Sequence, residues 1–457
     1  MTIRKANKGK TNHEKEARKK DKSLINSIGP GIISGAADTD PSSIATYSQS
    51  GAMFGYGLLW LSLVTFPLVS VIQEMSARIG LVTGMGLAQI MKQYYSKKLV
   101  YIVTSLLFIA NTINIGADIG AMGASLRLIF PQIPILPATI FFTSIILIAE
   151  VFLSYETYAR FLKYLTLSVL LYIVTAFLAV SGPSEWAKIG FATIVPHFEL
   201  SKEFVSMVVA VLGTTISPYL AFWQTSEEVE EQVKDRKLKD FQTDQIDGNE
   251  VKKAKVSKKE IRNMRTDIFS GMVLAQSIFW FIMITSATTL HNNNITNIGS
   301  AQDAAKALEP LVKGFPYSGQ IASGMFAIGI IGTGLISVPV LTASASYAVS
   351  ESFGWKEGLY RKFNQAPKFY GIIVAATGIG LWINFSGIDP IKALVYTAII
   401  NGFAAVPILV VITKISNNKK ILGEKTNNKI SNIVSIIAVA MMAVTATLTV
   451  LYTWVIK

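Results

Sequence analysis

Long apolar segments separated by short polar connections run through almost the whole chain. A helix needs roughly 20 apolar residues to cross a bilayer, and eleven segments reach or approach that length. They centre on residues 25–51, 56–80, 99–130, 136–154, 157–181, 203–223, 266–290, 319–350, 369–386, 390–413 and 430–456. The pattern therefore predicts an all-α integral membrane protein with eleven transmembrane helices.

The first apolar segment is interrupted at residues 35–43 by the sequence GAADTDPSS. Pro41 has no backbone N–H to donate, and it disfavours helical backbone at Asp40. A helix break at membrane depth must be covered by protein or line a cavity. A carboxylate there indicates an ion site by default. This stretch therefore predicts a cation site within the membrane.

A second break is predicted at residues 211–219, where the sequence reads VLGTTISPY. A proline in a membrane helix is often only a kink, so either break alone is ambiguous. The two breaks, however, fall in the first and sixth segments, which correspond if the first ten segments form two repeats of five. Paired broken helices of this kind point to a midplane substrate site in inverted-repeat transporters.

We therefore expect a LeuT-like 5+5 inverted repeat in which helices 1 and 6 are discontinuous. The expected parts are a basic cytoplasmic tail (1–23), a first five-helix repeat (24–190), a second repeat (195–414) that includes a cytoplasmic loop (224–265), and an eleventh helix (430–457).

Charge is scarce and unevenly distributed. Charged residues make up 16% of the chain, against about 25% in soluble domains, and the mean hydropathy is +0.44. The net charge of +13 could suggest a nucleic-acid partner, but the basic residues gather in the tail and in alternate connections. By the positive-inside rule this alternation places the N-terminus in the cytoplasm and, after eleven crossings, the C-terminus outside. We expect a bacterial-type plasma membrane and no nucleic acid.

The side chains at the two breaks are hard oxygen donors. Asp40 supplies a carboxylate, while Ser43, Thr214, Thr215 and Ser217 supply hydroxyls, and unwound backbone exposes carbonyls. Such ligands suit magnesium, calcium or manganese. The chain has no cysteine, and its three histidines fall in the tail or the predicted outer loops, which argues against a zinc or copper site at the midplane.

The chain resembles the NRAMP divalent-metal transporters, most specifically in its N-terminal part and through the eleven-segment layout further on. The resemblance rests on the sequences GPG at 29–31, DPSS at 40–43, FGYGLLW at 54–60 and ARIGLVTG at 77–84, and on residues 213–219. It implies an eleven-helix metal transporter in which Asp40, the carbonyls of Ala37 and Thr214, and the side chains of Ser43 and Ser217 coordinate the ion.

Several residues depart from that family's pattern. Ser42 and Ser43 stand where the family has glycine and asparagine, and Ser217 and Tyr219 stand where it has methionine and histidine. The loss of the methionine removes a soft sulfur ligand, and the loss of the histidine removes a titratable group. In the third segment Asp118 matches a family aspartate, but Ala121 replaces a glutamate, so proton coupling is in doubt.

These departures resemble those of the NRAMP-related magnesium transporters, which form a divergent branch. Magnesium gives up its water reluctantly, and serines leave room and hydrogen-bond partners for that water. We therefore expect import of a hard, largely hydrated ion by alternating access without proton coupling. We expect Mg²⁺ to be the transported ion, with Mn²⁺ as the alternative substrate. The metal ion is substrate rather than cofactor, membrane lipid is the other partner, and a monomer is compatible with this design.

Other polar residues have competing interpretations. Asp38 could attract the ion or cap a half-helix, and Asp118 could be a vestigial proton relay or pair with Arg127 or a hydroxyl. Glu74 and Arg78 are spaced for an ion pair on one helix face, with a role in the ion pathway as the alternative. Thr215, Tyr219 and Asn401 could support the site, as could Asn384. The acidic residues between Glu227 and Glu231 are expected on a solvated cytoplasmic helix and loop, with a regulatory or metal-sensing role as the alternative.

Three other functions compete with this hypothesis. A proton-coupled importer of manganese or another transition metal would use the same scaffold. A sodium-coupled amino-acid carrier would also, but Asp38 and Asp40 would repel a substrate carboxylate. A signalling protein with a transporter-like membrane domain would need a large soluble domain, and we expect none after the last helix. An enzyme is disfavoured because the sequence has no nucleophile–base pair, phosphate loop or metal-hydrolase spacing.

Overall fold

The computed structural model describes residues 30–152, 170–235, 237–238, 246–247, 250–251 and 256–454. The expected basic tail and much of the expected fifth membrane segment lie outside these residues. The predictions for those two parts therefore stay predictions.

The described chain is helical apart from one pair of two-residue strands. Its helices are α2 (Pro30–Asp38), α3 (Pro41–Phe54), α4 (Trp60–Thr83), α5 (Leu87–Tyr94), α6 (Lys97–Ile129), α7 (Ile135–Phe152), α9 (Leu171–Ala179), α10 (Pro183–Ile194), α11 (Lys202–Thr215), α12 (Pro218–Lys234), α13 (Lys258–Thr289), α14 (Ala301–Ala305), α15 (Ser318–Phe353), α16 (Pro367–Ile383), α17 (Pro390–Ser416), α18 (Lys419–Leu422) and α19 (Lys429–Trp454). Short 3₁₀ helices cover His291–Asn293, Lys306–Val312, Phe363–Gln365, Asn384–Ser386 and Gly423–Lys425. Strands β1 (Ile246–Asp247) and β2 (Glu250–Val251) pair antiparallel.

Nine helices of the described part are long and apolar enough to cross a membrane, if the two helices between Lys202 and Lys234 count as one. The first predicted segment is divided into α2 and α3, each too short to span alone. Of the fifth segment, the structure describes α9. The all-α membrane architecture is therefore confirmed, while the number of eleven crossings stays a prediction.

Two outer helices expose large apolar side chains. On α7 the exposed side chains include Ile140, Phe141 and Ile148. On α19 they include Ile433 and Ile436. A helix with this much exposed apolar surface would be unfavourable in water, so these two helices are suited to face lipid.

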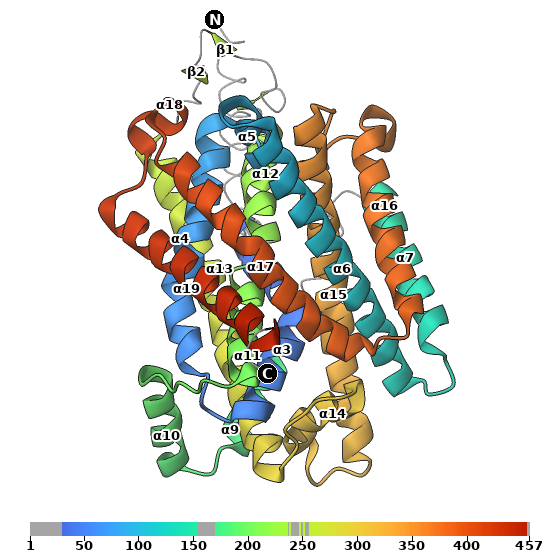
Figure 1. Ribbon diagram of the computed structural model, residues 1–457. Helices are drawn as coiled ribbons and strands as arrows, with labels where there is room; N and C mark the ends of the chain where they lie inside the picture. Colours follow the sequence, from blue (N-terminus) through green and yellow to red (C-terminus); the bar gives the residue numbers. More distant parts are fainter. Residues whose placement is uncertain are drawn as a thin grey trace, which may run out of the picture.

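Figure 1 shows α5, α18 and the two strands at one end of the bundle, and α10 and α14 at the other. We call the first the α5 end and the second the α14 end. The long helices run between the two ends, and α3 and α11 lie in the middle of the bundle. α6 packs against α7, α15, α16 and α17, and α13 packs against both α2 and α3. From Asp38 to Ala52 every residue of the broken first helix is buried in the bundle.

Two carboxylates, the buried Glu351 and the half-buried Glu230, join α12 to α15 at the α5 end. Glu351 on α15 accepts a hydrogen bond from the Ser226 hydroxyl of α12 over 3.2 Å. In the opposite direction, Glu230 on α12 accepts a hydrogen bond from the Tyr347 hydroxyl of α15. Glu228 is buried as well. The expectation that this acidic stretch is solvated is therefore wrong for Glu228, which is buried, and for Glu230, which α12 places against α15, whereas Glu231 is exposed.

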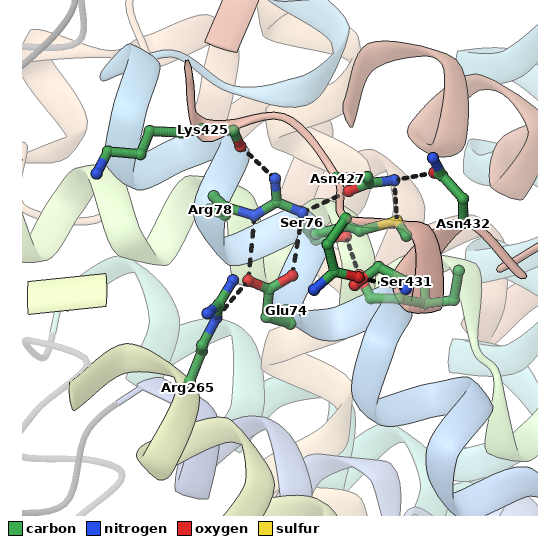
Figure 2. Close-up of polar contacts among 11 residues, drawn as sticks. Glu74, Ser76, Arg78, Arg265, Lys425, Asn427, Ser431 and Asn432 are labelled. Carbon is green, nitrogen blue, oxygen red and sulfur yellow. Dashed lines mark hydrogen bonds and ion pairs between the residues drawn. The ribbon is translucent and has the colours of Figure 1, made fainter. Parts of the chain in front are cut away.

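A second polar network at the same end joins α4 and α13 to the connection between α17 and α19 (Figure 2). The Arg78 guanidinium binds both carboxylate oxygens of Glu74 at 3.1 Å, which confirms the predicted ion pair. It also donates to the carbonyl of Lys425 and to the side-chain oxygen of Asn427. Arg265 of α13 binds Glu74 from the other side at 2.9 Å.

Candidate functional site

The break in the first helix is also a helix cap. Asp40 is the N-cap residue of α3, and its Oδ1 atom accepts the backbone N–H of Ser43 at 2.7 Å. Pro41 occupies the first helical position, where its missing donor costs nothing. Helices favour aspartate at the N-cap position and proline at the N1 position. The sequence DPSS therefore starts a new helix here, and the capping residue is Asp40 rather than Asp38.

Two further side chains hold the Asp40 carboxylate. The Ser42 hydroxyl lies 3.0 Å from each carboxylate oxygen. The side-chain amide of Asn114, on α6, donates to Oδ2 at 3.1 Å. Asp40 is 1% exposed. The carboxylate is thus oriented by its own helix on one side and by α6 on the other.

The second break lies between α11, which ends at Thr215, and α12, which begins at Pro218. Ser217 is the N-cap residue of α12, but its hydroxyl does not cap that helix. It turns back and donates to the carbonyl of Thr214. The last carbonyls of a helix lack helical partners, and this hydroxyl satisfies one of them.

The two breaks face each other. The hydroxyls of Ser43 and Thr214 are 2.7 Å apart, and Ser42 is 3.3 Å from the same Thr214 oxygen. One helical turn further along α3, the Tyr47 hydroxyl is 2.9 Å from the Thr215 hydroxyl. The structure therefore brings together the residues that the sequence assigned to one site from segments about 170 positions apart in the chain.

Tyr219 bridges from α12 to α2. Its hydroxyl donates to the carbonyl of Ala37 at 3.1 Å. Its own backbone carbonyl accepts the Ser344 hydroxyl of α15 at 2.8 Å. Tyr219 is therefore packed into the site, as the sequence suggested, and its hydroxyl reaches one of the two carbonyls that the family resemblance names as ligands.

The other expected supporting residues lie around this centre. The Asp38 carbonyl accepts the Ser43 hydroxyl at 2.6 Å. Asp118 on α6 accepts the Ser337 hydroxyl of α15 at 3.2 Å, so a hydroxyl is its partner. Asn401 on α17 is buried, and neither end of its amide has a hydrogen-bond partner among the described residues. Asn384 binds the carbonyls of Gly116 and Gly380.

The site is buried within the bundle. The side chains at its centre are at most 4% exposed; they belong to Asp38, Thr39, Asp40, Ser42, Ser43, Thr214, Thr215, Ser217 and Tyr219. The C-terminal ends of α2 and α11 meet here, and helix C-termini carry partial negative charge. Together with the Asp40 carboxylate, the carbonyls at these ends form a buried, oxygen-rich centre that suits a cation.

Sequence reasoning missed two residues of the site, Tyr47 and Asn114. Tyr47 lies one helical turn after Ser43, on the same face of α3. Asn114 lies one turn before Asp118 on α6. That spacing was the available signal, because a polar stripe on an apolar helix faces the bundle interior.

The chain matches known relatives over most of its length and most of theirs. The divalent metal cation transporter MntH of Caldanaerobacter subterraneus subsp. tengcongensis is 25% identical over 429 residues, which cover 93% of this chain and 92% of the relative. The protein of the same name from Deinococcus radiodurans is 24% identical over 426 residues, or 91% of this chain and 87% of the relative.

The fold is similar to solved transporter structures. The Eremococcus coleocola manganese transporter superposes with a TM-score of 0.69 at 17% identity, over 94% of this chain and 86% of that one. Mhp1, a nucleobase-cation-symport-1 family transporter, superposes with a TM-score of 0.56 at 10% identity, over 93% of each chain. These likenesses confirm the LeuT-like fold. The family model of natural resistance-associated macrophage protein-like sequences matches residues 31–452, and the chain therefore belongs to that family.

Proposed function

We propose that this chain carries a divalent metal cation across a membrane, and that the ion binds between the two broken helices. The metal site would consist of Asp40, Ser43 and Ser217 with the carbonyls of Ala37 and Thr214. Family membership supports the transport of a divalent metal. The hydrogen bond between Ser43 and Thr214 supports the location, because it joins the two breaks beside a buried carboxylate.

The proposed substrate is a hard, largely hydrated ion, with Mg²⁺ preferred and Mn²⁺ also accepted. Asp40 is surrounded by hydroxyl, amide and backbone groups. Serine and tyrosine stand at positions 217 and 219, where the family pattern has methionine and histidine. Oxygen ligands favour magnesium and manganese, whereas sulfur and imidazole favour softer metals.

We propose that transport is not coupled to protons. Tyr219 uses its hydroxyl to bind the Ala37 carbonyl, and Ala121 supplies no carboxylate. The competing proposal, a proton-coupled importer of manganese or a transition metal, is favoured by Asp118, which remains buried on α6.

We also propose how the chain is oriented in the membrane and where its two repeats begin and end. Lys92 of α5, Arg265 of α13 and Lys419 of α18 belong to the α5 end (Figure 1). The positive-inside rule would place this end in the cytoplasm. The repeats would span 24–190 and 195–414, with α2/α3 and α11/α12 as corresponding broken helices, and access would alternate as these helices rock against α6 and α15.

Reconstitution into proteoliposomes tests this function. We expect uptake of Mg²⁺ and Mn²⁺ by the wild type, with no acidification of the lumen. Asp40→Asn should abolish uptake while leaving the fold intact, because asparagine caps a helix as well as aspartate does. Asp40→Ala should abolish uptake and also lower the stability by about 1 kcal/mol, the usual cost of losing a cap.

Each of the other possible results refutes one part of the proposal. Uptake unchanged in Asp40→Asn would remove this carboxylate from the site. Metal-dependent acidification would establish proton coupling. Cadmium or iron uptake that magnesium does not compete with would show that the site prefers soft ions. Leucine uptake in the same vesicles would favour the amino-acid carrier.

A further inference from the structure

One face of α6 carries a polar stripe whose role the proposed function does not explain. Asn111, Asn114 and Asp118 are spaced by three and four residues, so they lie on the same face of the helix. They cover about 10 Å along the helix axis at 1.5 Å per residue. All three side chains are 0% exposed. An apolar membrane helix keeps such a buried polar stripe only at a cost, which indicates a function.

Each residue of this α6 stripe uses one polar atom to contact a neighbouring helix. Asn111 donates to the Leu341 carbonyl of α15 at 3.0 Å. Asn114 donates to Asp40 at 3.1 Å. Asp118 accepts from Ser337 at 3.2 Å. Of these three contacts, the one that Asn114 makes reaches Asp40, the carboxylate that is proposed to bind the metal ion.

Each residue also has one oxygen that no described group satisfies. These atoms are Oδ1 of Asn111, Oδ1 of Asn114 and Oδ1 of Asp118, and Oδ1 of Asp38 near the same centre is in the same condition. Buried polar atoms are nearly always hydrogen-bonded, so an unsatisfied group requires an explanation. All four atoms are hydrogen-bond acceptors, so each of them lacks a hydrogen-bond donor.

A hydrated metal cation presents donors in every direction. Its bound waters point their hydrogens outward. A bare cation has no hydrogen-bond donors, and an anion would be repelled by the carboxylates. We propose that the α6 stripe binds the water shell of the transported ion. Asn114 is the specificity-determining residue, because it both orients Asp40 and offers its own Oδ1 atom to a metal-bound water. This inference rests on the proposed function and adds residues that hold the hydration shell.

Uptake of Mg²⁺ and Mn²⁺ can be measured together with inhibition by hexaamminecobalt(III). This complex mimics a hydrated magnesium ion but does not release its ammonia ligands, so it can be recognised only through the outer shell. Asn114→Leu has nearly the same shape and loses both the amide donor and the oxygen. Asn114→Ser keeps a hydroxyl. Thr112→Val is the matched control, because the Thr112 hydroxyl binds the Phe108 carbonyl of its own helix.

We expect hexaamminecobalt(III) to compete with Mg²⁺ in the wild type. In Asn114→Leu, the KM for Mg²⁺ and the inhibition constant of the complex should both rise about tenfold, as expected for the loss of a hydrogen bond to a charged group. The KM for Mn²⁺ should rise less, because magnesium is the ion that keeps its water. Asn114→Ser should lie between Asn114→Leu and the wild type, and Thr112→Val should match the wild type.

Three results would overturn the inference. If hexaamminecobalt(III) does not inhibit a wild type that transports Mg²⁺, outer-shell recognition is refuted and the proposed function stands. If both Asn114 variants change Vmax alone, or change the KM of Mg²⁺ and Mn²⁺ equally, the residue is structural. A wild type that transports neither ion refutes the proposed function and this inference together. Thermal unfolding of each purified variant, with and without the complex, checks folding and binding independently of transport.

Discussion

The Tyr219 hydroxyl donates a hydrogen bond to the backbone carbonyl of Ala37 at 3.1 Å. The second break repeats the arrangement, since the Ser217 hydroxyl donates to the carbonyl of Thr214. Both carbonyls that the family resemblance assigns to the metal are therefore bound by hydroxyls at the start of α12. An ion that coordinates these carbonyls directly must displace a hydroxyl, or must use the remaining lone pair of each oxygen.

This geometry predicts that Tyr219→Phe strengthens substrate binding. The substitution leaves the Ala37 carbonyl without its donor, so the ion or its water no longer competes with the hydroxyl. A neutral hydrogen bond contributes about 1 kcal/mol, so the KM for uptake should fall about fivefold. Transport assays on Tyr219→Phe and Tyr370→Phe check this, because the Tyr370 hydroxyl binds the Arg361 carbonyl outside the site. A higher KM in Tyr219→Phe alone would instead show that the hydroxyl helps to hold the substrate.

The two arginines that bind Glu74 are predicted to differ in how much they stabilise the folded protein. The side chain of Arg78 is 3% exposed and that of Arg265 is 54% exposed. Lysine cannot reproduce the forked contacts of Arg78 with Glu74, Lys425 and Asn427. Arg78→Lys should therefore destabilise the protein by about 2 kcal/mol, the cost of two lost hydrogen bonds. Arg265→Lys should cost less than about 1 kcal/mol, as for exposed ion pairs.

Thermal unfolding in detergent distinguishes these two variants. Hydrogen exchange at residues 425–432 gives a second measurement, because Arg78 holds this connection against α4 (Figure 2). Equal melting temperatures for the two variants would contradict the assignment of Arg78 as the main link.

The sequence was sufficient to predict the two breaks because their causes are local. Pro41 and Pro218 each begin a helix at a position where proline is favoured. The Glu74–Arg78 pair was predictable for the same reason, since its partners are one helical turn apart. Local periodicity and proline chemistry therefore predicted most of what lies within single helices.

Contacts between distant helices were not predictable in the same way. Asn114 meets Asp40 only because α6 packs beside the broken helix, and a single sequence contains no information on that register. The acidic residues of α12 looked solvated because charge on a helix end normally faces water. Glu230 is instead held by Tyr347, which is more than a hundred residues away in sequence.

Glu351 is predicted to control the order of the α5 end. Its carboxylate accepts the backbone N–H groups of Ala88 at 2.8 Å and Gln89 at 3.2 Å, so it caps α5 from another helix. Glu351→Ala should cost about 1 kcal/mol of local stability, as for other lost caps. Amide exchange at the start of α5 should then become about fivefold faster.

Two matched variants separate the contacts of Glu351. A Cβ atom on Gly86 would lie 1.7 Å from Oε1 of Glu351, so Gly86→Ala should displace the carboxylate and reproduce the fast exchange in α5. Ser226→Ala removes the hydrogen bond by which Glu351 contacts α12 and leaves its contacts with α5 in place. Exchange in α5 should therefore stay at the wild-type rate. Slow exchange in both Glu351→Ala and Gly86→Ala would show that α5 does not depend on this cap.

The close approach of α11 and α17 at Gly213 gives the last prediction. A Cβ atom there would lie 2.2 Å from the Ala398 carbonyl oxygen and 2.4 Å from the Gly402 nitrogen, both backbone atoms of α17. In Gly213→Ala the two helices must separate, and α11 would carry Thr214 away from Ser43. Overpacking costs about 1–3 kcal/mol, so the variant should melt lower and lose most of its uptake.

Gly371→Ala on α16 is the matched control, because no described atom lies within 4 Å of its added Cβ. Alanine is favoured over glycine in a helix by about 1 kcal/mol, so this variant should be slightly more stable and should transport normally. Normal uptake in Gly213→Ala would show that the contact between Ser43 and Thr214 tolerates displacement. In that case the 2.7 Å distance between their hydroxyls would not be a requirement of the transport site.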